Sequence, residues 1–245
     1  GTQRIEEELH ALFPGVPAVR MDMDTTRGRH GHDAILTRFG RGEFQILLGT
    51  QMVAKGLDFP RVTLVGVISA DSELLFPDFR AGERTFQLLT QVAGRAGRKD
   101  KEGEVVIQTY TPDHYSLFYV RSHDYEHFFK AELKDRRELD YPPFSRMINI
   151  LFRGPREEAV VRVSRQYAEG LQPQTCFRML GPVPATLSKI ENNFRYQILL
   201  ISSKQNDPGG QKTREAVRGA MAQFKERHRS REVQVSIDVD PTSIL

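Results

Sequence analysis

The sequence has 245 residues, of which 39% are hydrophobic and 27% are charged, and its formal net charge is +3. This composition is typical of globular proteins with one or two domains, and no apolar run approaches the roughly 18 residues that a membrane-spanning helix needs. The single cysteine, Cys176, excludes an internal disulfide framework and a cysteine-ligated zinc cluster within these residues, so we expect a reducing, cytoplasmic environment.

The first 110 residues predict strands that alternate with helices, which is typical of a parallel α/β sheet. A helix near the N-terminus places Ile5, Leu9, Leu12 and Phe13 on one face, with Thr2 as its N-cap. The other expected helices are 31–40 and 83–96, and the expected strands are 18–21, 45–49, 62–70 and 104–110. The runs 45–49 and 62–70 are continuously apolar, as in strands that are buried on both faces.

Residues 113–139 are expected to be helical. Over 124–139 the residues Phe128 and Leu133 form an apolar stripe, and Arg136 and Arg137 are expected to face outward. Pro142-Pro143 ends this helix, because proline lacks an amide donor and restrains the residue before it. We therefore expect one domain over 1–141 and a second over 142–245.

The second domain predicts the order βαββαβ of a ferredoxin-like α+β fold. The expected strands are 147–152, 178–186, 196–202 and 233–239, and the expected helices are 156–171 and 210–227. This domain carries a net charge of +6, whereas residues 1–141 carry −3. A basic domain is compatible with a polyanionic partner, although a solvated basic surface explains the charge equally well.

The sharpest motif is Gln91-Val92-Ala93-Gly94-Arg95-Ala96-Gly97-Arg98. Arg95 and Arg98 lie on one side of a helix end, and such guanidinium pairs bind phosphate oxygens and stabilise charge during phosphoryl transfer. The glycine at 94 lets the backbone approach a ligand closely. The alternative is a helix C-terminus at which arginines merely complement the dipole. The preceding glutamine, Gln91, and the buried strand upstream favour the phosphate site.

A second motif follows the expected strand 45–49 and reads Gly49-Thr50-Gln51-Met52-Val53-Ala54-Lys55-Gly56-Leu57-Asp58-Phe59-Pro60. It lies at the carboxyl end of a strand, where α/β sheets bind ligands. Thr50 and Gln51 offer polar groups, Lys55 a cation, Gly56 a tight turn and Asp58 an acceptor for a hydroxyl. Alone, this motif would be interpreted as an ordinary polar loop. The arginine motif downstream strengthens its interpretation as a ligand-binding loop.

Together these segments match motifs V and VI of superfamily 2 helicases. The stretches "GTQMVAKGLDFPRVTLVGV", "PDFRAGERTFQLLTQVAGRAGR", "YPPFSR" and "IDVDP" resemble the replication-restart DNA helicases, the primosomal protein N′ (PriA) family. The resemblance covers nearly the whole chain and is densest over 45–110. It implies a second RecA-like helicase lobe, incomplete at its N-terminus, over 1–141, and the family's C-terminal domain over 142–245.

The resemblance also implies roles for individual residues. Those expected to face the γ-phosphate of ATP, which binds with Mg, are Gln91, Arg95 and Arg98. Those expected to approach the nucleotide are Gly56, Asp58 and Gly94. Those expected to contact the DNA backbone are Thr50, Gln51 and Lys55.

Other parts of such an enzyme are missing from these residues. The sequence has no Gly-x-x-x-x-Gly-Lys-Ser/Thr phosphate loop, no Asp-Glu-x-His run to hold magnesium, and none of the paired cysteines that bind zinc in the family. We therefore expect the C-terminal third of a longer helicase, with its zinc ligands upstream, and no ATP hydrolysis by this chain alone.

Basic residues beside aromatic ones suggest a second DNA-binding surface in the second domain. The expected hairpin carries Lys189, Phe194, Arg195 and Tyr196, and the last helix carries Lys212 and Arg214 among other cations. The alternative is a solvated helix face, with Phe194 and Tyr196 partly in the core.

Two smaller clusters are better explained by structure than by chemistry. His30 and His32 have no evident third metal ligand, so a loop is expected there. Asp22 and Asp24 precede threonines, which is more typical of a helix N-cap region than of a catalytic carboxylate pair.

The resemblance implies an ATP-dependent 3′-to-5′ DNA helicase that recognises stalled or collapsed replication forks and restarts replication by primosome assembly. The partners it implies are forked and single-stranded DNA, single-strand DNA-binding protein and primosome proteins, with no membrane. The alternatives are another superfamily 2 helicase or translocase, and a non-catalytic DNA- or protein-binding module. The βαββαβ domain after "YPPFSR" argues against the first, and the intact segment 91–98 argues against the second.

Overall fold

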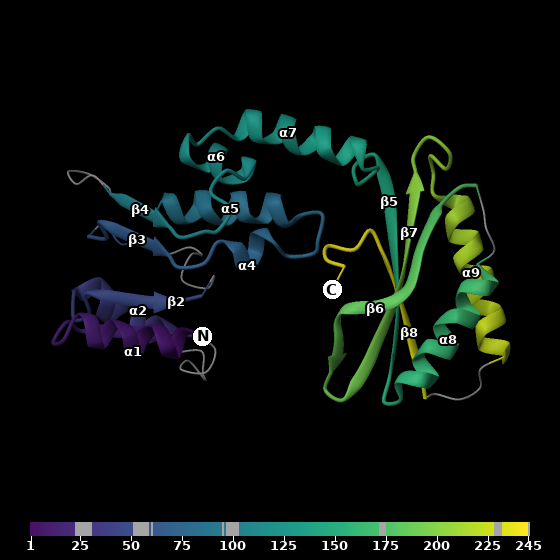
Figure 1. The fold of residues 1–245 in the computed structure, drawn as a ribbon, viewed down its shortest axis with the longest axis horizontal. Helices are drawn as coiled ribbons and strands as arrows, with labels where there is room; N and C mark the ends of the chain where they lie inside the picture. The colour runs from purple at the N-terminus through teal and green to yellow at the C-terminus, as the bar shows by residue number, and fades with distance from the viewer. Residues whose placement is uncertain are drawn as a thin grey trace. The chain divides into compact units, whose positions relative to one another are not determined.

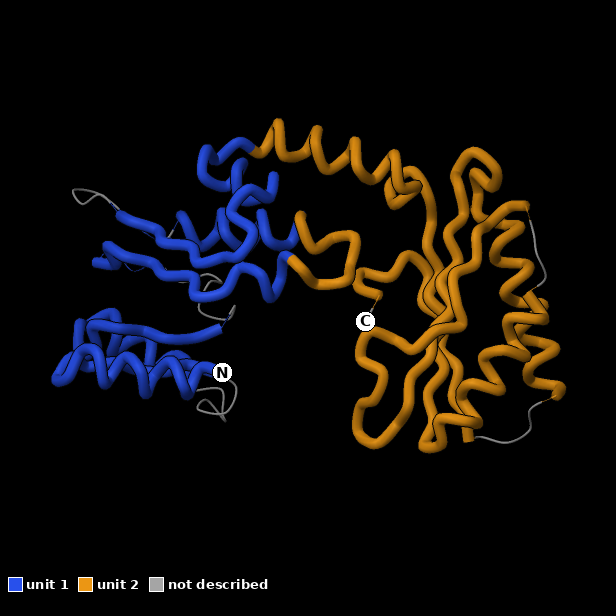
Figure 2. Tube along the Cα trace, viewed as in Figure 1, with its two compact units in different colours: residues 1–74, 83–124 blue, residues 75–82, 125–245 orange. Residues whose placement is uncertain are grey.

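The computed structural model describes residues 1–22, 31–50, 59, 61–94, 96, 103–171, 175–227 and 232–244. The chain forms two compact units, shown in different colours in Figure 2. The first unit contains residues 1–74 and 83–124, and the second contains residues 75–82 and 125–245. The division into domains at residue 141 stays a proposal.

The first unit alternates helices and strands, as the sequence predicts (Figure 1). Its strands form parallel pairs, β1 with β2 and β3 with β4. The strands are β1 (Ala18–Met21), β2 (Ile46–Gly49), β3 (Leu64–Val67) and β4 (Glu104–Ile107). The helices are α1 (Thr2–Leu12), α2 (Gly31–Arg41), α4 (Asp71–Leu74), α5 (Ala81–Ala93) and α6 (Tyr115–Arg121). The first two residues of α5 belong to the second unit.

Two expectations for this unit are wrong in detail. Gly1, not Thr2, is the N-cap of α1, and the Thr2 hydroxyl donates to Asp22 instead. The run 62–70 yields only β3, which alternates between exposed and half-buried residues. Leu64 at the start of β3 is 60% exposed, so β3 is not buried on both faces.

The helix α7 (Tyr125–Glu138) opens the larger part of the second unit and corrects another expectation. Arg137 is exposed as expected, but the side chain of Arg136 is only 12% exposed and forms an ion pair of 2.6 Å with the buried Glu132. The cause lies far away in the sequence, because the Arg136 guanidinium lies over the ring of Phe79, 5.2 Å from its centroid. Phe79 belongs to residues 75–82, which we call the strap.

The remainder of the second unit confirms the βαββαβ order. Its elements are β5 (Ser145–Gly154), α8 (Glu157–Gly170), β6 (Arg178–Ile190), β7 (Asn193–Ser203), α9 (Gln211–Arg227) and β8 (Gln234–Val239). The strands form one antiparallel sheet in the order β6-β7-β5-β8, which is the ferredoxin-like arrangement. Both helices, α8 and α9, cover the same face of the sheet (Figure 1).

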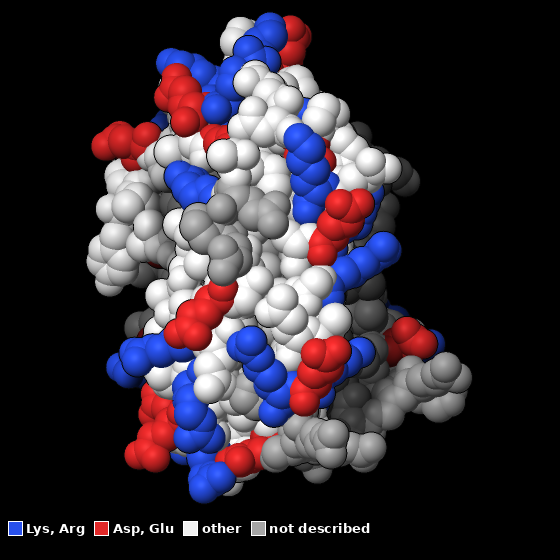
Figure 3. All heavy atoms as spheres, turned by 90° about the vertical axis from the view of Figure 1, so that its right-hand side faces the viewer, with Lys and Arg blue, Asp and Glu red and all other residues white. Residues whose placement is uncertain are grey.

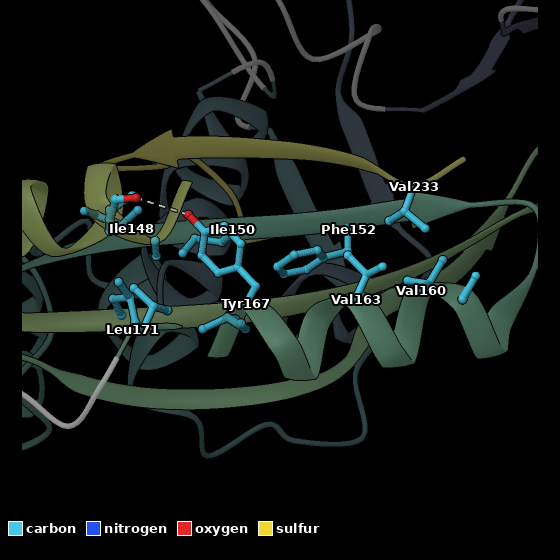
Figure 4. Close-up of a cluster of buried hydrophobic side chains, with 13 residues drawn as sticks. Ile148, Ile150, Phe152, Val160, Val163, Tyr167, Leu171 and Val233 are labelled. Carbon is cyan, nitrogen blue, oxygen red and sulfur yellow. Dashed lines mark hydrogen bonds between the residues drawn. The ribbon is translucent and has the colours of Figure 1, made fainter. Parts of the chain in front are cut away.

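The main core lies between this sheet and its two helices (Figure 4). Ile150 and Phe152 of β5 are fully buried, as is Val160 of α8. The ring of Tyr167 packs edge-on against Phe152 with centroids 5.4 Å apart, and its hydroxyl donates to the Val217 carbonyl oxygen at 3.3 Å. Burial raises the pKa of Tyr167 to about 12, because the charged phenolate is disfavoured away from water.

The opposite face of the sheet is covered as well, which explains why β5 is buried along most of its length. Met147, Leu199 and Ile201 form a smaller cluster on this face. Phe79 of the strap, Tyr141 and Ile244 near the C-terminus pack against it. The strap is therefore part of the second unit by packing, although α4 and most of α5 on either side belong to the first.

Candidate functional site

The loop after β2 holds the expected DNA-contacting threonine at an exposed position. Thr50 directly follows β2 and is exposed. Gln51, Lys55, Gly56 and Asp58 lie outside the described residues. At the far end of this loop, the Phe59 ring packs edge-on against Phe39 of α2, with centroids 4.8 Å apart. Phe59 is thus held by an aromatic contact.

The carboxyl ends of β1 and β2 meet at one edge, because Met21 pairs with Gly49 in parallel register. Asp22 follows β1 there, but its carboxylate already accepts from the Thr2 hydroxyl at 2.9 Å and pairs with Arg20 at 3.2 Å. These contacts tie α1 to β1, so Asp22 has a structural role. Asp24 lies outside the described residues.

The arginine motif begins on the last turn of α5. Gln91 is exposed there, while Phe86 and Leu89 on the other side of the helix are 4% and 1% exposed. The helix ends at Ala93, earlier than the expected Ala96, and the amide of Gly94 donates to the Thr90 carbonyl at 3.1 Å. Arg95 and Arg98 lie outside the described residues.

Gly94 itself leaves the end of α5 open. A Cβ atom at this position would approach nothing closer than the Thr90 carbonyl oxygen, at 3.6 Å. That is an ordinary contact, so the described surroundings do not require glycine for packing. Its exposure and lack of a side chain instead make the backbone accessible to a ligand, as a nucleotide-binding role would need.

Asp71 is a polar centre that sequence reasoning missed. It begins α4, close to the carboxyl end of β3, and binds the segment that follows β4. Its carboxylate accepts from the hydroxyls of Thr109 and Thr111 at 3.0 and 3.1 Å and from the amide of Tyr110. The pattern Thr-x-Thr at the end of the expected strand 104–110 is the signal that could have pointed to it.

Two opposing effects set the pKa of Asp71. Partial desolvation raises the pKa, but the hydrogen bonds from the Tyr110 amide and from Thr109 and Thr111 outweigh it and hold the pKa below its ordinary value. A carboxylate that accepts so many bonds is a structural anchor, which fixes the ends of β3 and β4 relative to α4.

Of the two cations expected on the hairpin of β6 and β7, Lys189 is exposed, whereas Arg195 is buried. The two-residue turn of the hairpin, Glu191-Asn192, has positive φ at both positions, as in type I′ hairpins. Arg195 is only 9% exposed, and its guanidinium donates to the Leu187 carbonyl at 3.2 Å. The Lys189 ammonium lies over the Phe194 ring, 4.6 Å from the centroid.

The two aromatic residues of the hairpin are engaged with the domain itself. Phe194 and Tyr196 are half-buried against the main core. The Tyr196 hydroxyl donates to the Glu157 carboxylate at 3.0 Å. The arrangement favours a structural role for both rings over base stacking.

The first turn of α9 presents Lys212 and Arg214 at exposed positions. It is fixed by the buried Asp207, which accepts from the Thr213 amide at 3.0 Å and the Thr213 hydroxyl at 2.8 Å. Burial raises the pKa of Asp207, but these bonds and those from the amides of Lys212 and Gln211 outweigh it and lower the pKa. The exposed cations therefore stand on a rigid helix start.

The face formed by α8 and α9 is not one basic patch. Lys and Arg side chains are interspersed with Asp and Glu across it (Figure 3). On α8, Arg162 and Arg165 lie among Glu157, Glu158 and Glu169, and on α9 Lys225 is next to Glu226. The solvated-face interpretation therefore holds for most of this surface, and the cations at the start of α9 are the exposed candidates that remain.

Neither a metal site nor a membrane segment is found in the part of the chain that the structure describes. No group of three His, Cys, Asp or Glu side chains there is placed to hold a metal ion. His32 lies in α2, and its expected partner His30 is outside the described residues. None of the described helices is both long and apolar enough to cross a membrane.

Two family models match the chain in succession. The helicase conserved C-terminal domain matches residues 1–100, and the primosomal protein N C-terminal domain matches residues 137–242. The first match covers both candidate motifs, and the second covers the antiparallel sheet with its two helices.

Curated relatives that carry the name replication restart protein PriA match across both regions. The protein of Bacillus subtilis is 43% identical over 248 positions, which cover 100% of this chain and 30% of the relative. That of Synechocystis is 45% identical, with 82% of this chain and 24% of the relative covered. That of Haemophilus influenzae is 39% identical, with 100% and 33% covered. The chain therefore spans about a third or less of the relatives it matches.

Proposed function

Because this chain belongs to the PriA family of replication restart proteins, we propose that it supplies one nucleotide-facing helicase lobe and the C-terminal domain of an ATP-dependent 3′-to-5′ DNA helicase. The helicase recognises stalled or collapsed replication forks and restarts replication by primosome assembly. The observation that carries the proposal is the segment 91–98, which begins on the exposed last turn of α5 within the helicase-matched residues.

The described end of α5 fits the edge of a nucleotide site. Gln91 is exposed, and Gly94 leaves the backbone open next to it. In this proposal Gln91, Arg95 and Arg98 face the γ-phosphate of ATP, and Gly56 and Asp58 approach the nucleotide. The two guanidiniums would stabilise the charge that develops on the transferring phosphoryl group.

The proposal assigns DNA contacts to both units. Thr50, Gln51 and Lys55 follow β2 and would contact the DNA backbone. In the C-terminal domain, the exposed Lys212 and Arg214 are the main candidates, and Lys189 is a lesser one. Arg195 is buried against Leu187, so its contribution is to hold the hairpin.

Magnesium and zinc belong to the proposal only through the family resemblance. Among the described residues no set of carboxylates, histidines or cysteines fits either ion. Single-strand DNA-binding protein, primosome proteins and a cytoplasmic location are likewise proposed from the family.

The proposal predicts that this chain alone does not hydrolyse ATP. Phosphoryl transfer needs a cradle for the β- and γ-phosphates, and the sequence contains no phosphate loop. The test is the ATPase rate of the purified chain with and without single-stranded DNA. Repeating it with Gln91→Ala controls for contaminating enzymes. A DNA-stimulated rate above background that Gln91→Ala abolishes would contradict the division of the active site between two lobes.

A further inference from the structure

A cavity of about 290 Å³ opens within the second unit, where four separate segments of the chain converge. The strap contributes Arg80, and the start of β5 contributes Ser145 and Arg146. The turn after β7 contributes Lys204, and the segment after β8 contributes Asp240 and Pro241. None of these residues was a candidate in the sequence, because they meet only in the folded unit.

Three cations line this cavity, and backbone carbonyls rather than carboxylates hold the two guanidiniums. Arg80 donates to the Pro241 carbonyl at 2.6 Å, and Arg146 donates to the Asp207 carbonyl at 3.2 Å. Within the described part of the chain, no ion pair joins Arg80, Arg146 or Lys204 to a carboxylate. A carbonyl orients a guanidinium without neutralising it, so the cavity keeps an excess of positive charge.

The single carboxylate at the cavity, Asp240, does not cancel this excess. It faces the backbone of β5, where one of its oxygens accepts from the Met147 amide at 3.4 Å. Three cations against one carboxylate leave a net charge of about +2 in a small volume. Such a site favours an anion.

The wall also holds an unused hydrogen-bonding group. Ser145 is 2% exposed, and its hydroxyl has no hydrogen-bond partner among the described residues. A buried hydroxyl without a partner is costly, so a ligand or an ordered water is expected to complete it. Ser145, Arg80 and Arg146 line the same cavity, and hydroxyl and guanidinium groups are donors that bind the oxygens of a phosphate.

The exposed cations at the start of α9 lie next to one residue of the cavity lining, Arg146. Gly210, which has φ of +67°, lies between them. A Cβ atom there would lie 3.1 Å from Cδ of Arg146 and 3.5 Å from a guanidinium nitrogen of Arg214. Arg146 and Arg214 therefore flank one glycine, and Lys204 lines the same cavity as Arg146.

We propose that this cavity binds one phosphate group of a DNA strand, and that the strand continues past Arg214 and Lys212 on α9. The inference rests on the proposed function, because DNA is the polyanion that the family match supplies. The net charge of the domain suggested only a general affinity for polyanions. The proposal adds a specific phosphate site, which is assigned to Arg80, Arg146, Lys204 and Ser145. The cations of the cavity and of the start of α9 can each neutralise a phosphate of a strand that carries one at every nucleotide.

The test is a fluorescence-anisotropy titration of the 245-residue chain with a 3′-labelled 20-nucleotide oligothymidylate at several salt concentrations. Lys204→Gln is the leading variant, since this side chain is exposed and its loss should not disturb the fold. Arg146→Gln and the double variant follow, with thermal unfolding to confirm that the start of α9 is intact. Lys134→Gln is the matched control, because Lys134 is an exposed lysine of the same unit on α7.

We expect Lys204→Gln to weaken binding about three- to tenfold and to lower the slope of log K against log salt by roughly 0.7, which is the value for one phosphate of a single strand. The double variant, which combines Lys204→Gln with Arg146→Gln, should bind more than tenfold more weakly. Lys134→Gln should weaken binding less than twofold. The titration is repeated with and without a 5′-phosphate on the oligonucleotide. Equal affinities identify an internal phosphodiester, and a gain that Lys204→Gln abolishes identifies a terminal phosphate.

Two results would overturn the assignment. If Lys204→Gln and the double variant bind like Lys134→Gln while all show salt-dependent binding, the cavity is not a phosphate site, although the domain still binds DNA. If the unmodified chain does not bind at low salt, both the cavity and the DNA contacts of this domain are wrong. The assignment of Arg95 and Arg98 to ATP is measured separately and is untouched by either result.

Discussion

The rings of Phe79 and Tyr141 stack nearly parallel, with centroids 5.1 Å apart and an interplanar angle of 15°. Phe79 belongs to the strap, and Tyr141 directly precedes Pro142-Pro143. The guanidiniums of Arg80 and Arg136 lie over the same Phe79 ring, at 4.5 and 5.2 Å. The helix that carries Gln91 begins at Ala81, so the chain enters it directly from an element packed on the C-terminal sheet.

The strap is further fixed by the buried Asp78. Its carboxylate accepts from the Arg80 amide at 2.9 Å and from the Ile244 amide at 3.4 Å. Removal of the Phe79 ring, which these contacts position, should therefore destabilise the second unit as a whole.

We predict that Phe79→Ala lowers the free energy of unfolding of the second unit by about 3 kcal/mol, the lower end of the range for loss of a packed phenylalanine, since Phe79 is only half-buried. Urea denaturation monitored by circular dichroism measures it. Phe118→Ala is the control, because Phe118 is 63% exposed and its loss should change little. Equal stabilities for the two variants would show that the strap adds no stability.

The core tyrosine predicts a loss of stability at alkaline pH. The pKa of Tyr167 is about 12 in the folded chain and near 10 when unfolded. Because the folded value is higher, the stabilisation that Tyr167 contributes is complete below about pH 10 and is lost as the pH rises toward 12. Tyr167→Phe should flatten this decline, and at neutral pH it should cost about 1 kcal/mol for the lost hydrogen bond.

Unfolding curves between pH 7 and 11.5 test this second prediction. Tyr110→Phe serves as the control, since Tyr110 is 89% exposed and should leave the alkaline decline unchanged. The account of the core is contradicted if Tyr167→Phe and the original chain lose stability in parallel across this range.

The exposed cations of α9, rather than the hairpin, are expected to dominate DNA binding by the C-terminal domain. Lys212→Glu with Arg214→Glu should weaken binding of single-stranded DNA at least tenfold, because both side chains are exposed and stand on a rigid helix start. Lys189→Glu should weaken it less, since that ammonium is engaged with the Phe194 ring. A filter-binding titration compares them, with Lys134→Glu as the control for net charge. If Lys189→Glu weakens DNA binding more than the α9 double variant does, the hairpin, not α9, is the main DNA contact.

The fold was largely predictable because its signals are local. The order βαββαβ follows from the alternation of apolar strand and helix patterns, and the structure confirms it. The errors have long-range causes. Arg136 was expected outside because its partner ring, Phe79, lies far away in the sequence. The burial of β3 was overestimated because an apolar run does not reveal which elements cover it.

The candidate site could be predicted only in part, for the same reason. The motif around Gln91 is contiguous in the sequence and was recognisable. The cavity lined by Arg80, Arg146 and Lys204 combines residues from four segments, so no local pattern indicates it. Arg195 looked like a surface cation, but strand alternation in β7 turns it toward the Leu187 carbonyl.

The central claim is that Arg95 and Arg98 act on the γ-phosphate of ATP. The most direct measurement is the DNA-stimulated ATPase rate of a full-length helicase that includes these residues, with Arg98→Ala and Arg95→Ala measured separately and Arg121→Ala as an exposed control on α6. We predict a rate lower by about 10³-fold or more in each arginine variant, with DNA affinity within about twofold of the original. Turnover like that of Arg121→Ala in either variant would contradict the account.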